Sequence, residues 1–217
     1  MLILLPPSEA KNEPTAGKPL NLDRLFAHKE LKKERQEVLV ASKKVLTAPA
    51  RPAHEIYSGV LYQALDWGSL STTAKSRGEK SILIISALFG AVRITDLIPT
   101  YKAKIKTSLW KSALSHVLDD LGESVIVDCR SSTYTGVWTP PQEKTVLVRV
   151  FQIRDGKRSV ITHMSKKYRG ELTRALLQNP ATKEPKDVYE IAQKYFDCEF
   201  TPATVREPSK LDLLIHI

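Results

Sequence analysis

The segment from Ser81 to Gly90, SILIISALFG, contains the unbroken apolar run Ile82-Leu83-Ile84-Ile85, which ends at Ser86. A short apolar run bounded by turn residues is typical of a strand buried on both faces of a parallel sheet. Two more runs of this kind, residues 1–5 and 124–128, lie elsewhere in the chain. Together the three runs predict the centre of a sheet.

Helical patterns separate and follow these strands. Helices are predicted over residues 22–46, 58–66, 69–76, 107–122, 166–178 and 185–196, from apolar spacing, capping residues and prolines. The segments 146–153 and 160–164 flank Asp155-Gly156, a pair suited to a type I′ turn, and so predict a hairpin. The tail, 199–217, is expected to hold one edge strand.

This mixture of strands and helices predicts an α/β fold, a mixed sheet flanked by helices in a single domain over residues 1–217. The alternative is two domains with a boundary near residue 140, because Pro140-Pro141 separates the first part from a hairpin followed by helices.

Composition narrows the classes of function. The 217 residues have a formal net charge of +9, which favours polyanionic partners such as nucleic acid or nucleotides. No apolar run reaches the roughly 18 residues of a membrane span, and the N-terminal run is too short for a signal peptide. Cys129 and Cys198 alone make neither a disulfide framework nor a thiolate zinc site. We therefore expect a cytoplasmic protein with no metal, and with no cofactor, because GxGxxG and P-loop motifs are absent.

Polar clusters follow each of the three apolar runs. In open α/β sheets, ligands bind beyond the carboxyl ends of the strands. If these strands are parallel neighbours, the clusters form one positively charged cleft for phosphate or another oxyanion. The alternative is that the side chains only cap strands and pair at the surface. The candidate phosphate-binding residues at these strand ends are Ser8, Lys11, Arg93, Arg130, Ser131 and Tyr134.

Two further basic stretches are candidates for nucleic-acid binding. Lys166, Lys167 and Arg169 start a predicted helix, where cations oppose the helix dipole unless an anion lies between them. Tyr101 and Lys102 begin a stretch of lysines interleaved with aromatic residues, which suits binding a phosphate backbone and stacking bases. In both stretches the alternative is a solvated surface.

Some of these side chains also suit catalysis. Lys11 could hold an anion or polarise a carbonyl group, while Asp96 or His163 could move a proton. A lone histidine near a strand end is more often a structural residue, and a buried, inert thiol is the favoured interpretation of Cys129.

The clusters, in this order, resemble the YaaA family of peroxide stress proteins. The matching blocks are Pro7-Ser8-Glu9-Ala10-Lys11, Ile56-Tyr57-Ser58-Gly59, the segment 85–102, Val127-Asp128-Cys129-Arg130-Ser131-Ser132-Thr133-Tyr134, and Ser165-Lys166-Lys167-Tyr168-Arg169-Gly170. Three positions depart from the family pattern: Ala87 replaces a glycine, Ile94 a proline, and Thr133 a glutamate that could have served as an acid or base.

The resemblance implies a cytoplasmic α/β protein with a fold peculiar to the family and a positively charged cleft. It also implies a DNA-binding helix-hairpin-helix element, for which Ala87 to Tyr101 is the best candidate, with Gly90 in the hairpin. The implied role is protection from hydrogen peroxide by limiting damage linked to unincorporated iron.

Two functions remain open at this point. The first is a stress protein that binds DNA non-specifically, and the second is an enzyme acting on a nucleobase, nucleoside or nucleotide in the same cleft. A third possibility is a scaffold whose charge serves only solubility. The sequence gives no prediction of the oligomeric state.

Overall fold

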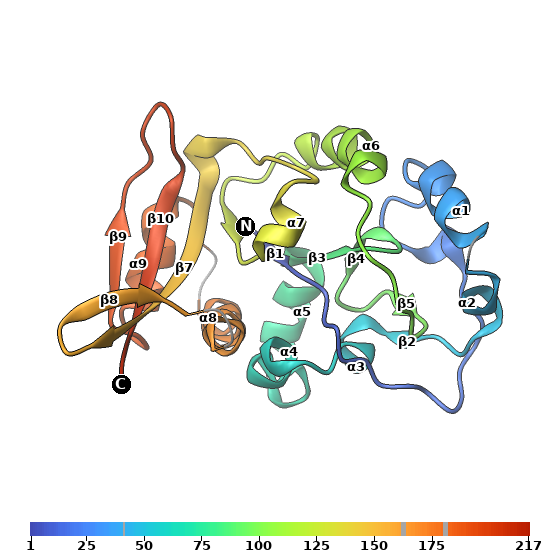
Figure 1. Ribbon diagram of the computed structural model, residues 1–217, viewed down its shortest axis with the longest axis horizontal. Coiled ribbons are helices and arrows are strands. Elements are labelled where there is room, and N and C mark those ends of the chain that lie inside the picture. Colours follow the sequence, from blue (N-terminus) through green and yellow to red (C-terminus); the bar gives the residue numbers. More distant parts are fainter. Residues whose placement is uncertain (41, 162–163, 180–181) are drawn as a thin grey trace.

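A computed structural model describes residues 1–40, 42–161, 164–179 and 182–217. Its main sheet has the strand order β4-β3-β1-β6-β7-β10-β9, and β8 pairs with β7 (Figure 1). The strands are β1 (Leu2–Leu5), β3 (Ile82–Ser86), β4 (Gly90–Arg93), β6 (Ile126–Asp128), β7 (Thr145–Arg154), β8 (Lys157–Val160), β9 (Cys198–Thr201) and β10 (Ser209–His216). A small second sheet pairs β2 (Arg51–Pro52) with β5 (Leu97–Ile98).

The five central strands are parallel, and β4, β8 and β9 are antiparallel to their neighbours. The strand β1 lies between β3 and β6, with Ile3 opposite both Ile82 and Val127. Every residue of β1 and β3 is buried, as their unbroken apolar runs predict. Because the chain enters all these strands from the same end, their following loops meet at one edge of the sheet.

Helices cover both faces of the central strands (Figure 1). One face packs against α3 (Ala53–Ile56), α4 (Val60–Leu65), α5 (Thr72–Ser81), α8 (Ser165–Gln178) and α9 (Pro185–Ala192). The other face packs against α6 (Thr107–Asp119), whose Trp110 and Leu114 are fully buried against β1 and β3. This is the α/β fold with a mixed, helix-flanked sheet that the sequence predicts.

The prediction of one continuous helix over residues 22–46 is wrong. The chain instead forms η1 (Leu22–Arg24), α1 (Lys32–Val40) and α2 (Lys43–Thr47). Ala27 has a positive φ, which ends any helix there. Arg35 is buried and donates hydrogen bonds to the carbonyl groups of Phe26, Phe89 and Ala91. The bonds to Phe89 and Ala91 tie α1 to β4, and the bond to Phe26 holds the preceding segment beside it, so the chain does not continue as one helix.

The predicted hairpin is confirmed between β7 and β8, and Asp155 and Gly156 both have a positive φ in its turn. The second strand covers Lys157–Val160 and shares only Val160 with the predicted segment 160–164, in which residues 162 and 163 lie outside the described residues. The tail contains two strands where one edge strand is predicted, and β10 lies inside the sheet between β7 and β9. The sheet is continuous across residue 140, since β6 pairs with β7.

The segment from Ala87 to Tyr101 is not a helix-hairpin-helix. It contains β4 and β5 joined by a turn, and β4 folds back on β3 with Gly90 opposite Ser86. Pairing with the outer edge of β3 satisfies the backbone groups of that strand, which a helix in this place would leave open. Across the described ranges, no helix is both long and apolar enough to cross a membrane.

Candidate functional site

Two adjoining cavities lie beyond the carboxyl ends of the central strands. The larger has a volume of about 790 Å³ and is bounded by the loop after β1, the start of α4 and the start of α8. The smaller has a volume of about 460 Å³ and lies toward the loop after β3. Both are lined by Ser8, Glu9, Lys104 and Tyr134. The carboxyl edge of the sheet, where the sequence predicts a binding site, therefore contains two cavities.

The charged lining of these cavities is mostly positive. Its cations are Lys11, Lys102, Lys104, Lys166 and Arg169, and its carboxylate is Glu9. In the part of the chain that the structure describes, no carboxylate forms an ion pair with any of these five cations. Cations that gather without carboxylate partners are the arrangement that attracts phosphate groups.

Lys11 lies half-buried in the smaller cavity. Its Nζ donates a hydrogen bond to the backbone oxygen of Ser8 at 2.6 Å. The same atom lies 4.6 Å from the ring centroid of Tyr101 and 5.7 Å from that of Tyr57. Burial lowers the pKa of the Lys11 ammonium group, and the charge of Glu9 opposes that effect. Lys11 therefore loses its proton more readily than an exposed lysine.

A hydrogen-bonded group of hydroxyls forms the floor beneath Lys11. The Ser86 hydroxyl oxygen accepts bonds from the backbone N–H groups of Leu88 and Phe89, and lies 2.7 Å from the Tyr101 hydroxyl. The Tyr101 hydroxyl lies 2.8 Å from that of Tyr57. Burial raises the pKa of Tyr101 to about 12 and that of Tyr57 well above its ordinary value. Both phenols are therefore neutral at physiological pH.

Two glycines of the resemblance blocks allow close contacts at the site. A Cβ atom at Gly59 would lie 2.3 Å from the Ser8 hydroxyl oxygen. A Cβ atom at Gly170 would lie 2.2 Å from the backbone oxygen of Leu61 and 2.9 Å from the Cβ of Ala64. Gly59 thus lets α4 approach the loop after β1, and Gly170 lets α8 pack on α4. None of Gly59, Gly170 and Tyr57 is among the predicted site residues, although all three lie in the matching sequence blocks.

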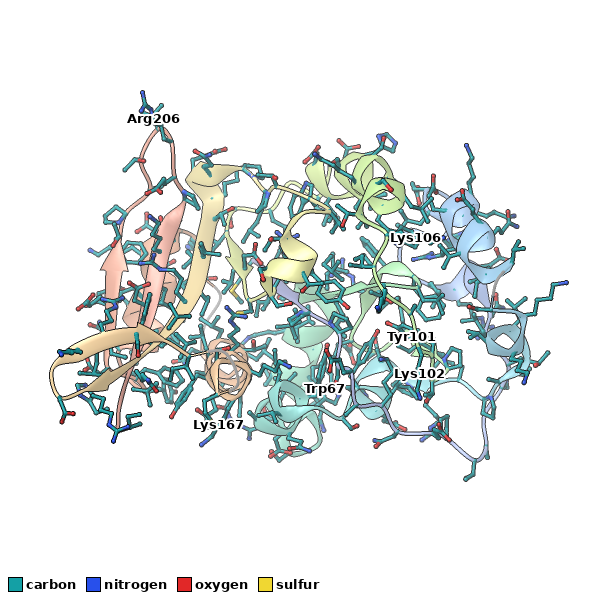
Figure 2. The ribbon with its side chains drawn as sticks, viewed as in Figure 1. Trp67, Tyr101, Lys102, Lys106, Lys167 and Arg206 are labelled. Atoms are coloured by element: carbon teal, nitrogen blue, oxygen red, sulfur yellow. The ribbon has the colours of Figure 1, made fainter. Side chains whose placement is uncertain are left out.

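Eight of the predicted binding residues line the two cavities. The larger cavity is lined by Ser8, Ser131, Tyr134, Lys166 and Arg169, and the smaller by Ser8, Lys11, Tyr101, Lys102 and Tyr134. Figure 2 shows Tyr101 and Lys102 close together near β5. Arg169 also donates a hydrogen bond to the backbone oxygen of Val148 at 3.3 Å, which ties α8 to β7.

Arg130 lies at this edge of the sheet, but its guanidinium group is already occupied. It forms two side-chain bonds to Asp128, at 2.7 and 2.9 Å, and a third to the backbone oxygen of Tyr134. The pair is almost completely buried. Arg130 thus neutralises Asp128 and fixes the loop after β6, and it does not line either cavity.

Arg93 and Asp96 also lie outside the cavities. The Asp96 carboxylate accepts hydrogen bonds from the backbone N–H groups of Phe26 and Arg93, both at 2.9 Å, and burial raises its pKa. The Arg93 guanidinium group lies over the Phe26 ring and donates to the backbone oxygen of Lys80. These contacts hold the turn after β4 against the segment before α1.

Three other predicted residues have different placements. Gly90, with φ of +73°, packs against the indole of Trp110. Lys167 points outward from α8 and pairs with Glu171 (Figure 2). The candidate proton carrier His163 lies outside the described residues. Cys129 is fully buried, and burial raises its pKa to about 12, which makes it the inert thiol that the sequence analysis favours.

Fold and cavities together define an α/β protein with a cation-lined hollow at the carboxyl edge of its sheet. A family model described as "Peroxide stress protein YaaA" matches residues 1–200. The chain is 35% identical to a UPF0246 protein of Streptomyces coelicolor, covering all of this chain and 99% of that protein. A UPF0246 protein of Corynebacterium glutamicum is 33% identical, over 89% of this chain and 92% of the relative.

An uncharacterized protein of Campylobacter jejuni is 30% identical, covering 79% of this chain and 82% of the relative. The chain belongs to the YaaA family of peroxide stress proteins. The family matches therefore confirm the resemblance that the sequence blocks indicate.

Proposed function

We propose that this protein acts in the cytoplasmic response to hydrogen peroxide by binding duplex DNA through the cations around the two cavities. The observation that carries the proposal is their charge: five cations line them beside one carboxylate, Glu9. The description of the family supports the role in peroxide stress. A helix-hairpin-helix is not part of the proposal, because the segment expected to form it is a pair of strands.

In the proposed complex, the lysine and arginine side chains contact phosphates, which position a protein on DNA without reading its sequence. Lys104 and Lys102 follow one another along the loop before α6, and Lys166 lies at the start of α8. A DNA backbone laid over the cavity mouths would meet both groups. Binding of this kind is independent of sequence and depends strongly on salt.

The DNA-bound protein would limit peroxide damage linked to unincorporated iron by covering the phosphates at which free cations collect. Within the described ranges, no group of three or more histidine, cysteine, aspartate or glutamate residues is arranged to hold a metal ion. We therefore place the protective effect on the covered DNA and assign iron to none of the described residues.

The test is fluorescence anisotropy of a labelled duplex over a range of salt concentrations. If all five cations contact phosphates, log Kobs falls with log salt with a slope of about −4.5. Two duplexes of unrelated sequence should give the same curve. Absence of binding at low salt would contradict the proposal, as would a slope near zero.

A second candidate function is an enzyme acting on a nucleobase, nucleoside or nucleotide. The observation that favours it is the hollow itself, because about 790 Å³ is within the range of small-molecule sites. The lining contains hydroxyl groups, an amine and a carboxylate, which a protein that only binds phosphates does not need. The hydroxyls belong to Ser8 and Tyr134, the amine to Lys11 and the carboxylate to Glu9. Asp96 lies elsewhere, so Glu9 takes its place as the available carboxylate.

Thermal unfolding in the presence of nucleobases, nucleosides and nucleotides separates this candidate from the first. A ligand that binds the folded protein raises Tm by mass action. A rise with one small molecule, saturating and resistant to salt, supports the enzyme. A rise with duplex DNA alone, lost in salt, supports the DNA-binding protein.

A further inference from the structure

The smaller cavity contains a partly buried amine, that of Lys11. Lys11 is half-buried there, and its Nζ lies over the Tyr101 ring. Lys102 and Lys104 line the same cavity and are exposed, so the lining around the Lys11 amine is rich in cations. A lysine that is partly desolvated is the type that attacks carbonyl carbon.

The position of Lys11 is fixed from several sides. It forms an isolated antiparallel bridge with Tyr57, and the backbone N–H of Asn12 donates to the oxygen of Ile56 at 2.8 Å. The bond from its Nζ to the Ser8 oxygen holds the end of the side chain at the wall of the cavity. An amine held in this way is presented to a ligand at little entropic cost.

We propose that Lys11 is a nucleophile that forms an imine with the aldehyde of a base-free deoxyribose in DNA. This inference rests on the proposed DNA binding, since Lys102, Lys104 and Lys166 would hold the phosphates on either side of the sugar. A base-free sugar suits the smaller cavity because it lacks the base that would otherwise fill the space in front of the amine. Oxidative damage to DNA releases bases and leaves such sugars.

The proposed reaction is imine formation followed by elimination, and neither step uses a metal or an oxidant. The neutral Lys11 amine adds to C1′ of the open-chain sugar, and loss of water leaves a C=N bond. Its protonated form withdraws electrons from C2′, so a base removes a proton there. Glu9 is the carboxylate in the lining that could accept it. The C3′–O bond then breaks, the phosphate leaves with the electron pair, and water hydrolyses the imine to restore Lys11.

The experiment mixes the full-length protein with a labelled duplex that carries one abasic site, and adds sodium borohydride to reduce any imine. The expected result is a covalent protein–DNA adduct on a denaturing gel, and strand cleavage at the abasic site when borohydride is omitted. Mass spectrometry of a tryptic digest should locate the reduced adduct on Lys11.

The matched variants are Lys11→Arg, which keeps the charge but forms no stable imine, and Lys186→Arg on α9, away from the cavities. We expect Lys11→Arg to lower adduct formation roughly tenfold or more and Lys186→Arg to leave it unchanged. An adduct that maps to other lysines, or that persists in Lys11→Arg, would overturn the assignment.

Binding of the intact duplex, measured by anisotropy on the same samples, separates the two proposals. Duplex binding without an adduct overturns the inference and leaves the proposed function standing. If the duplex does not bind, the proposed function fails, and 2-deoxyribose 5-phosphate with borohydride then probes the amine alone. Labelling of Lys11 by that sugar would support its role as a nucleophile, and absence of labelling would overturn it.

Discussion

The Nζ atom of Lys11 lies 4.6 Å from the centroid of the Tyr101 ring. Lys11 belongs to the loop after β1, and Tyr101 follows β5, so the contact joins two segments that are distant in sequence. Ser86 at the end of β3 fixes the Tyr101 hydroxyl from beneath. The three residues couple the loops that shape the smaller cavity.

The partly buried position of Lys11 predicts that the pKa of its amine is lower in the folded protein. Burial lowers its pKa, so the folded protein releases this proton at a lower pH than the unfolded chain does. Stability should therefore rise as pH increases from the folded to the unfolded pKa of Lys11. Competitive acetylation followed by mass spectrometry should give Lys11 a lower titration midpoint in the folded protein than in the unfolded chain. Equal midpoints would contradict the account.

The buried pair of Asp128 and Arg130 is predicted to act on stability. Replacing Arg130 by Met leaves the Asp128 carboxylate buried without its partner, and should lower the free energy of unfolding by about 3–5 kcal/mol. Urea denaturation measures the change. The double variant Asp128→Leu with Arg130→Met removes the orphaned charge and should recover much of the loss. A fully stable single variant would show that the pair does not hold the loop.

Because α8 packs closely on α4, adding a single methyl group between them is predicted to lower the stability of the protein. Gly170→Ala places a Cβ atom 2.2 Å from the Leu61 oxygen, so α8 must move away, at a cost of about 1–3 kcal/mol. Gly68→Ala is the control, because nothing lies within 4 Å of a Cβ atom there. Thermal unfolding should show a lower Tm for Gly170→Ala alone. Equal Tm values for both variants would mean that α8 and α4 are less tightly packed.

Much of the central fold could be predicted because its signals are local. The unbroken apolar runs of β1 and β3 and the Asp155-Gly156 turn each depend on neighbouring residues, and each is confirmed. The segment before α1 could not be predicted in the same way. Its shape depends on bonds from Arg35 to carbonyl groups that come from β4 and its preceding loop, far away in sequence.

The same contrast between local signals and long-range contacts applies to the candidate site. Residues directly after strands, such as Ser8 and Ser131, line the cavities because parallel strands bring their following loops together. Arg93 ends β4, which runs antiparallel to β3 and carries it back opposite Leu83, near the start of that strand and away from the cavities. Arg130 follows β6, but its guanidinium group is already bonded to Asp128. Charge alone therefore does not separate a free cation from one that is already paired.

The most direct test of the account compares the salt dependence of duplex binding in two variants with the same net charge. Lys104→Gln with Lys166→Gln removes two cations of the larger cavity. Lys186→Gln with Lys194→Gln removes two exposed lysines that line neither cavity. Anisotropy titrations from low to moderate salt give the slope of log Kobs against log salt for each protein.

The slope of the cavity variant is expected to become shallower by about 1.8, since each lost phosphate contact changes it by about 0.9, and its affinity at low salt should fall. The control variant should keep the slope of the unmodified protein. Equal slopes in the two variants would contradict the claim that DNA binds at the cavities.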